Sequence, residues 1–285
     1  MTHREVVNRI LAYHPDLGAD YNGCDNWKAG DPDRECTGVT TALVANIGVI
    51  RRTIELGANL IIVHEPTFYT SADGAGWFED FPNSVYEEKR RLIDEHGIAI
   101  WRDHDHMHAH DPDGIFTGVI KYLGWEGHCK VDNSSGVFAH FLIDFPETTL
   151  GELCRHVVDT IGINGLRYIG DPSAHVSSLA MVGHIMPMSR PRSDGGRPVE
   201  YGVQMIDLLE RQVDVIMPGE TIDWTVLSYL RDAVQLGRAK GMIHVGHFNW
   251  EELGMKYAQE WISGLVPELE VTYVPSGDMY GFVTR

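Results

Sequence analysis

Short runs of apolar and β-branched residues alternate with helical patterns along almost the whole chain of 285 residues. In the first half, residues 38–45 predict a strand and residues 47–56 a helix. The continuous apolar run 60–63 predicts a strand covered on both faces, and a charged helix near 83–96 and a strand at 98–101 follow. Because strands that alternate with helices favour parallel pairing, this rhythm predicts an α/β fold with mostly parallel sheets.

The same alternation continues in the second half of the chain. The expected strands lie near 138–144, 177–182, 213–217, 241–245 and 269–274, and the expected helices near 149–161, 200–211, 223–237 and 250–263. The polar stretch 132–136 is the best boundary between two lobes of similar size. We therefore predict an N-terminal α/β lobe over residues 1–132 and a C-terminal α/β lobe over residues 133–285.

The charge balance restricts the partners of the chain. Asp and Glu number 41 against 23 Lys and Arg, which gives a formal net charge of −18, and 15 His stand outside that sum. Nucleic acids and anionic membrane surfaces reward Lys and Arg, so neither is expected as a partner. The chain has no apolar run of the roughly 18 residues that a membrane span needs, no signal sequence, and four widely spaced Cys. We expect a cytoplasmic protein whose acidic residues and histidines suit cations.

Histidines gather where the predicted strands end. His104 and His108 belong to a seven-residue window with four His that directly follows one strand. His64 and Glu65 follow the buried apolar run, and His247 lies just beyond another strand. Ligand sites of open α/β sheets lie at the carboxyl ends of strands, so three strand ends each deliver side chains that can bind a metal.

The spacing of these residues also suits a metal ion. His104 and His108 are four residues apart, and so are His247 and Glu251. Residues at this spacing on a helix lie on one face, about 5–6 Å apart. Imidazoles and carboxylates suit Zn, Fe, Mn or Ni. A carboxylate can also bridge two ions about 3.5–4 Å apart, a recurring hydrolytic arrangement.

Each of these patterns also has a simpler interpretation. The His/Asp window can be a solvated loop, and His64 can be a buried imidazole with its hydrogen bonds satisfied. His247 and Glu251 can simply cap the start of a helix. The agreement of three separate strand ends favours the metal site.

Three segments resemble the NIF3-like family (NGG1-interacting factor 3-like proteins), whose members carry a dinuclear metal centre. GANLIIVHEPTFY resembles the family's strand that runs into a His-His-Pro/Gly motif, IAIWRDHDHMH its strand followed by His-x-x-x-Asp, and VGHFNWEELGM its C-terminal element with His and Glu. The resemblance covers residues 24–110 and 177–282 and implies a metal site between two α/β lobes. The ligands that it implies are His64, Glu65, His108, His247 and Glu251, with His104 as a further ligand or as a close neighbour of the ligands.

The sequence departs from the family pattern at two of these positions. The second His of the family's pair is Glu65 here, and the family's Asp is His108. A His has become a carboxylate at one strand end, and a carboxylate has become a His at another. This exchange preserves the number of ligands and roughly their charge, so we expect a site for two divalent ions (Zn, Fe, Mn or Ni) with exchanged ligands.

Some family members are described as GTP cyclohydrolase type 2. The resemblance therefore implies a dinuclear metal-dependent hydrolase that opens a C–N bond of a heterocycle or cyclic amide in a small-molecule substrate. Glu251 would bridge the ions, and His104 or Glu220 would shuttle the proton. The alternative is a non-catalytic metal-binding or regulatory protein-interaction protein, which a closed coordination sphere would favour. The resemblance also implies a homo-oligomeric ring, since hexamers are common in the family.

Overall fold

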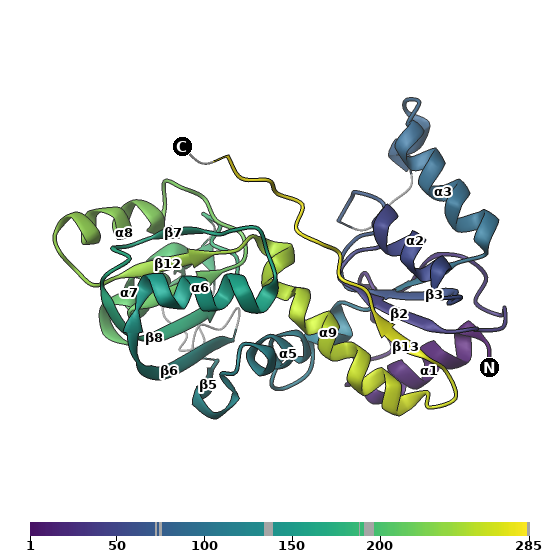
Figure 1. Ribbon diagram of the computed structural model, residues 1–285, viewed down its shortest axis with the longest axis horizontal. Coiled ribbons are helices and arrows are strands. Elements are labelled where there is room, and N and C mark those ends of the chain that lie inside the picture. The colour runs from purple at the N-terminus through teal and green to yellow at the C-terminus, as the bar shows by residue number, and fades with distance from the viewer. Residues whose placement is uncertain (72, 74–75, 134–138, 188, 191–196, 284–285) are drawn as a thin grey trace. The chain divides into compact units, whose positions relative to one another are not determined.

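The computed structural model describes residues 1–71, 73, 76–133, 139–187, 189–190 and 197–283 (Figure 1). The contacts within the chain divide it into two compact units. Unit 1 comprises Met1–Val119 and Glu251–Gly277, and unit 2 comprises Ile120–Trp250 and Asp278–Arg285. The chain therefore leaves unit 1 and later returns to it.

Unit 1 is built on a five-stranded sheet in the order β1-β4-β3-β2-β13. The strands are β1 (Trp27–Ala29), β2 (Val39–Ala42), β3 (Leu60–Val63), β4 (Ala99–Arg102) and β13 (Val271–Tyr273). Four of them pair in parallel, and only β1 runs antiparallel to its neighbour β4. All four residues of β3 are buried, as the apolar run predicts for a central strand covered on both faces.

Helices pack against this sheet, and their apolar side chains form the core of unit 1 together with those of the strands. Their bounds are α1 (His3–Tyr13), α2 (Ile47–Glu55), α3 (Ser84–His96), α4 (Asp105–His108), α5 (Gly114–Tyr122) and α9 (His247–Leu265), with a 3-10 turn η1 (Gly76–Glu79). Val49 and Ile50 of α2 share one buried cluster with Ile61 of β3 and Ile93 of α3. The three strands and two helices predicted for the first half are confirmed as β2, β3, β4, α2 and α3.

Unit 2 contains a six-stranded sheet in the order β5-β6-β8-β11-β12-β7. Its strands are β5 (Cys129–Asp132), β6 (His140–Thr149), β7 (Arg167–Ile169), β8 (His175–Val182), β11 (Val215–Pro218) and β12 (Gly241–His244), beside a two-stranded ribbon of β9 (Ser189–Arg190) and β10 (Val199–Glu200). Its helices are α6 (Leu150–Ile161), α7 (Tyr201–Arg211) and α8 (Val226–Gln235), with a 3-10 turn η2 (Glu126–His128). Met205 and Leu209 of α7 pack with Ile216 of β11 and Leu230 of α8.

The sheet of unit 2 contains more antiparallel pairs than the mostly parallel sheet that the sequence predicts. Only β8, β11 and β12 pair in parallel, and β5, β6 and β7 join the sheet antiparallel. β5 and β7 are short edge strands with no buried residue, so they carry no apolar run by which the sequence would reveal them. The α/β class is confirmed, and the sheet of unit 2 is mixed.

The division into units also differs from the predicted boundary at residue 132. Val271 and Tyr273 of β13 pair with Val39 and Thr41 of β2, so residues 251–277 belong to unit 1 and not to a C-terminal lobe. Strand pairing between distant segments leaves no local mark in the sequence. The polar stretch expected as the boundary lies mostly outside the described residues, which resume at residue 139.

Within the described part of the chain, none of the helices combines the length and the apolar character that crossing a membrane requires.

Candidate metal centre

Three histidines of unit 1 converge beyond the carboxyl ends of β3 and β4. His64 directly follows β3, His104 stands at the N-cap of α4, and His108 is the last residue of that helix. The rings of His64 and His104 stack with their centroids 4.5 Å apart, and Nε2 of His64 lies 3.1 Å from Nε2 of His108. One ring nitrogen of each lies within 4.8 Å of the other two, so all three can reach one ion.

Each of these rings is held at Nδ1 by an oxygen atom. The pairs are His64 with the main-chain carbonyl of Asp103 (3.1 Å), His104 with Oδ1 of Asp105 (2.8 Å) and His108 with Oδ2 of Asp113 (2.6 Å). Carbonyl and ionised carboxylate oxygens only accept, so each Nδ1 donates and each Nε2 is left for a ligand. Metal-binding histidines in proteins are usually oriented in this way.

The Nε2 atoms of His64 and His108 have the spacing of two ligands of one cation. Each nitrogen would lie about 2.0–2.1 Å from a zinc ion, which places the two roughly 3 Å apart at the angles of a tetrahedral or octahedral site. The observed 3.1 Å fits this separation. Without an atom between them, two lone pairs would face each other, and therefore the geometry calls for a proton or a metal ion there.

Two buried carboxylates complete the donor set. Oε2 of Glu251 lies 3.5 Å from Nε2 of His64, and Glu65 joins both residues in a second group whose ligand atoms lie within 4.8 Å of one another. Oε2 of Glu65 also lies 3.7 Å from Nη2 of Arg102, a buried ion pair. Since His64 belongs to both groups, the five side chains form one continuous set of imidazoles and carboxylates.

The environment shifts the protonation of the histidines in opposite directions. Burial lowers the pKa of His64 well below its ordinary value, and the neighbouring His104 lowers it further. Burial also acts to lower the pKa of His108, but the hydrogen bond and charge of Asp113, together with Glu251 and Glu65, raise it to about 9. A neutral His64 thus faces a protonated His108 at neutral pH, and a metal ion would have to displace that proton.

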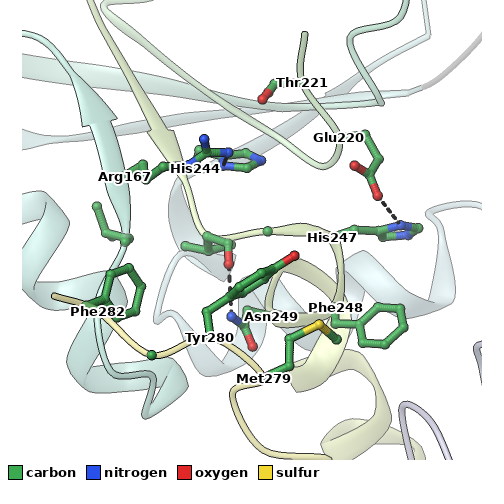
Figure 2. A pocket seen from close by; sticks show the side chains of 15 residues that line it. Arg167, Glu220, Thr221, His244, His247, Phe248, Asn249, Met279, Tyr280 and Phe282 are labelled. Atoms are coloured by element: carbon green, nitrogen blue, oxygen red, sulfur yellow. Dashed lines mark hydrogen bonds and ion pairs between the residues drawn. The ribbon is translucent and has the colours of Figure 1, made fainter. Parts of the chain in front are cut away.

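His247 and Glu220 lie in unit 2. Nδ1 of His247 is 3.3 Å from Oε1 of Glu220, and its ring is 4.4 Å from the ring of His184. Figure 2 shows His247 and Glu220 pointing toward one another among the side chains of a pocket of about 640 Å³. The described residues of unit 1 thus bring together five of the six expected ligands, and a ligand role for His247 stays a prediction.

The same pocket holds an arginine fixed by a neutral histidine. Nη2 of Arg167 donates to Nδ1 of His244 at 2.9 Å, and Nε2 of His244 donates to the carbonyl of Gly219 at 3.0 Å. Burial and the charge of Arg167 lower the pKa of His244, which therefore stays neutral. Tyr280 and Phe282 contribute aromatic rings beside it (Figure 2). A guanidinium next to aromatic rings suits a planar anionic ligand.

The acceptors that orient the histidines were not predicted from the sequence. Asp113 precedes α5, a helix not expected from the sequence, and its Oδ1 also accepts from the amides of Ile115 and Phe116. Asp is a common cap at the start of a helix. A prediction of α5 would therefore have pointed to Asp113. Asp103 acts through its main-chain carbonyl, which no side-chain pattern can reveal.

Two α/β units, one of them with His and carboxylate donors gathered at its strand ends, define an α/β protein with a candidate metal centre. The model of the Duf34/NIF3 (NGG1p interacting factor 3) family matches residues 2–184. The chain belongs to this family, which confirms the resemblance seen in the sequence.

Curated relatives share this family's sequence at low identity. A protein of Clostridium acetobutylicum called GTP cyclohydrolase 1 type 2 homolog is 24% identical over 255 residues, which cover 87% of this chain and 84% of the relative. A Staphylococcus aureus protein of the same name is 25% identical over 223 residues. That alignment covers 76% of this chain and only 52% of the Staphylococcus protein, about half of its length.

Solved structures share the fold. A Staphylococcus aureus hypothetical protein superposes with a TM-score of 0.67 at 17% identity and 99% coverage of both chains. A Bacillus cereus protein related to NIF3 gives a TM-score of 0.67 at 14% identity, covering 100% of this chain and 99% of that one. At these identities the likeness concerns the fold alone.

Proposed function

We propose that the chain is a metal-dependent hydrolase whose metal centre is formed by His64, Glu65, His104, His108 and Glu251. The observation that carries the proposal is the approach of Nε2 of His64 to Nε2 of His108 at 3.1 Å, with Oε2 of Glu251 3.5 Å from the former. Both rings are fixed at Nδ1 by an oxygen, so their free nitrogens point at one place. The mixed N and O donors suit two divalent ions of Zn, Fe, Mn or Ni.

Divalent ions held there would supply Lewis acidity and a nucleophile at neutral pH. The residues of the chain have separate tasks around them. His64 and His108 bind through Nε2, while Glu65 and Glu251 supply negative charge from a buried position. The side chains of His104 and His108 are each 27% exposed, and of these two we assign proton transfer to His104 because His108 is a ligand. Glu220 remains the second candidate for this proton transfer.

The substrate class that we propose is a small molecule with a C–N bond in a heterocycle or cyclic amide. The name GTP cyclohydrolase 1 type 2 homolog, carried by the relatives, supports this class. We also propose, from the family resemblance, that the chain forms a homo-oligomeric ring, which light scattering after gel filtration tests.

The test is a hydrolysis screen on protein purified without oxygen and analysed for metals. Cyclic amides, amidines and purine nucleotides are the substrates to offer. We expect activity that a chelator removes, that metal restores, and that Glu251→Ala lacks. Glu260→Ala, an exposed carboxylate on the same helix, is the matched control and should keep both metal and activity. Equal activity in Glu251→Ala and the parent protein would overturn the proposal.

A non-catalytic metal-binding protein is the second candidate, because His64, Glu65 and Glu251 are all buried. Such burial is typical of structural metal sites, whose coordination sphere is closed. Cobalt substitution separates the two: added azide or cyanide should change the visible spectrum of an open site and leave that of a closed site unchanged.

A further inference from the structure

Unit 1 contains a second group of potential ligands that the proposed centre does not use. Asp25 lies in the segment before β1, Asp103 directly follows β4, and His106 belongs to α4. One nitrogen or oxygen atom of each lies within 4.8 Å of the other two. Asp25 is 7% exposed and Asp103 0%, while the side chain of His106 is 12% exposed. Two buried carboxylates and a largely buried imidazole are therefore brought together.

One oxygen of this group has no hydrogen bond. Oδ2 of Asp103 accepts from Nε2 of His14 at 2.9 Å. Oδ1 of Asp103 is fully buried, and the residues that the structure describes offer it no hydrogen-bond partner. Buried polar atoms nearly always have a partner, so a cation or donor outside this set of atoms is expected at Oδ1.

His106 and Asp25 already have the spacing of two ligands of one ion. Nδ1 of His106 lies 2.7 Å from Oδ2 of Asp25. Two ligand atoms each about 2.0–2.1 Å from an ion lie roughly 3 Å apart when they meet it at a right angle, so a small outward shift admits the ion. Asp25 is fixed for this role, because its carboxylate also accepts the amides of His104, Asp105 and His106.

The hydrogen bonds within the chain account for only some of the polar atoms of Asp25, Asp103 and His106. Asp25 acts as the cap of the turn that begins α4, which accounts for both of its oxygens. It does not account for Oδ1 of Asp103, or for a second carboxylate held close to the first in a buried place, where like charges repel strongly. The contacts of the neighbouring Arg102 go to Glu65 and to the carbonyls of His64 and Ser71.

We propose that Asp25, Asp103 and His106 form a binding site for one divalent transition-metal ion, separate from the donor set around His64. The ion takes the place of the proton between His106 and Asp25 and gives Oδ1 of Asp103 its missing partner. Oxygen and imidazole donors without a thiolate suit Zn, Mn, Fe or Co. The site does not depend on the hydrolase activity proposed above.

Zinc stoichiometry tests the site. The full chain is dialysed to equilibrium against micromolar Zn²⁺ and its bound zinc is measured by elemental analysis. Asp103→Asn and His106→Gln should each hold one zinc ion per chain fewer than the parent. Asp111→Asn is the matched control, since Asp111 lies in the same His/Asp window, is exposed, and belongs to none of the ligand groups found among the described residues.

A double variant distinguishes zinc bound at this site from zinc bound at the donor set around His64. His108→Ala with Glu251→Ala removes ligands of the donor set around His64 and should leave one zinc ion per chain bound. Adding His106→Gln to this background should remove that last ion. The His106→Gln variant is expected to fold, because His106 is partly exposed and Gln is also polar. A thermal melting curve checks this.

Three results would overturn the proposal. The first is equal zinc in His106→Gln and the parent. The second is loss of zinc in Asp111→Asn as well. The third is binding at millimolar zinc only, which would mark an adventitious ion. None of these results bears on the hydrolase, which is judged by activity in Glu251→Ala.

Discussion

The acceptors at Nδ1 decide how well the histidines of unit 1 can bind a metal. His108 shows this most clearly, because Oδ2 of Asp113 lies only 2.6 Å from its Nδ1 and raises its pKa. The carboxylate fixes the ring and its tautomer, and it makes Nε2 a stronger ligand. The affinity of the proposed metal site would therefore depend on residues outside its ligand set.

Asp113→Asn should weaken metal binding without unfolding the protein. The amide keeps an oxygen for the amides of Ile115 and Phe116, so the start of α5 stays capped. It withdraws the charge that orients His108, and loss of such an acceptor typically costs about 10–100-fold in metal affinity. Competition against a chromophoric chelator measures this loss, with Asp111→Asn as control. Affinities equal to the parent's would contradict the role given to Asp113.

The metal-free protein should lose stability as the pH rises from about 7 to 9. The pKa of His108 is raised in the folded state, so the folded chain holds a proton that the unfolded chain releases near its ordinary value. The stabilisation is complete below the unfolded pKa of about 6.5 and is lost through about 9; it amounts to at most about 3 kcal/mol.

Urea unfolding at several pH values in a chelating buffer measures this decline. Other groups titrate in the same range, among them Lys89, whose pKa burial lowers to about 8 and which acts in the opposite direction. The comparison with Asp113→Asn isolates His108, since that variant should show a flatter dependence. Identical pH profiles for the two proteins would refute this explanation.

At the scale of elements, α5 and α9 approach each other through glycines. A Cβ atom added to Gly254 of α9 would lie 2.8 Å from the carbonyl of Ile115, and one added to Gly118 of α5 would lie 2.5 Å from Cβ of Tyr257. Real Cβ contacts are never so short. These two positions admit only hydrogen, and the close packing of the helices depends on that.

Gly254→Ala should destabilise the protein by about 1–3 kcal/mol, because overpacking outweighs the gain of about 1 kcal/mol in helix propensity. Gly264→Ala in the same helix is the control, since an added Cβ there meets nothing within 4 Å. That variant should be as stable as the parent or slightly more so. Chemical denaturation of both variants gives the comparison, and equal effects would show that the helices separate easily.

Elements with a strong local pattern were predictable from the sequence. The apolar run 60–63 is β3, and residues 47–56 contain α2, which ends at Glu55. α5 escaped prediction because it mixes β-branched residues with Gly114 and Gly118 and is stabilised by packing. A local sequence pattern predicts an element that its own residues stabilise. It fails for an element that is stabilised mainly by packing against distant parts of the chain.

The candidate site was predictable to a similar degree. Strand ends pointed to His64, Glu65, His104 and His108, which the structure brings together with Glu251. Asp103 is buried, and its Oδ2 accepts from His14, a residue 89 positions away along the chain. Such a contact arises only from the folded chain, so the Asp25 group could not be anticipated.

At the scale of the whole molecule, unit 1 is discontinuous in sequence. A chain that ends at residue 277 keeps β13 and the part of α9 that belongs to unit 1, whereas a chain that ends at residue 250 lacks both. Without β13, the edge of β2 and its hydrogen-bonding groups lie open. The shorter chain also lacks Glu251.

We expect the chain 1–277 to keep a folded unit 1 that binds metal, and the chain 1–250 to lose both. Hydrogen exchange at β2 and β3 and zinc analysis of the two proteins measure this difference. Slow exchange in the chain 1–250 would mean that the first 119 residues fold without their C-terminal strand.

The return of the chain to unit 1 also sets an order of events during synthesis. Four of the five residues of the donor set precede residue 109, and the fifth is Glu251. A growing chain therefore displays three histidines and Glu65 to the cell long before the ribosome has made their last partner. Domains generally fold as units while the chain is being made, and unit 1 must wait for residues 251–277. The proposed centre can therefore capture metal only after residues 251–277 have been made, and these follow residues 120–250 of unit 2 in the chain.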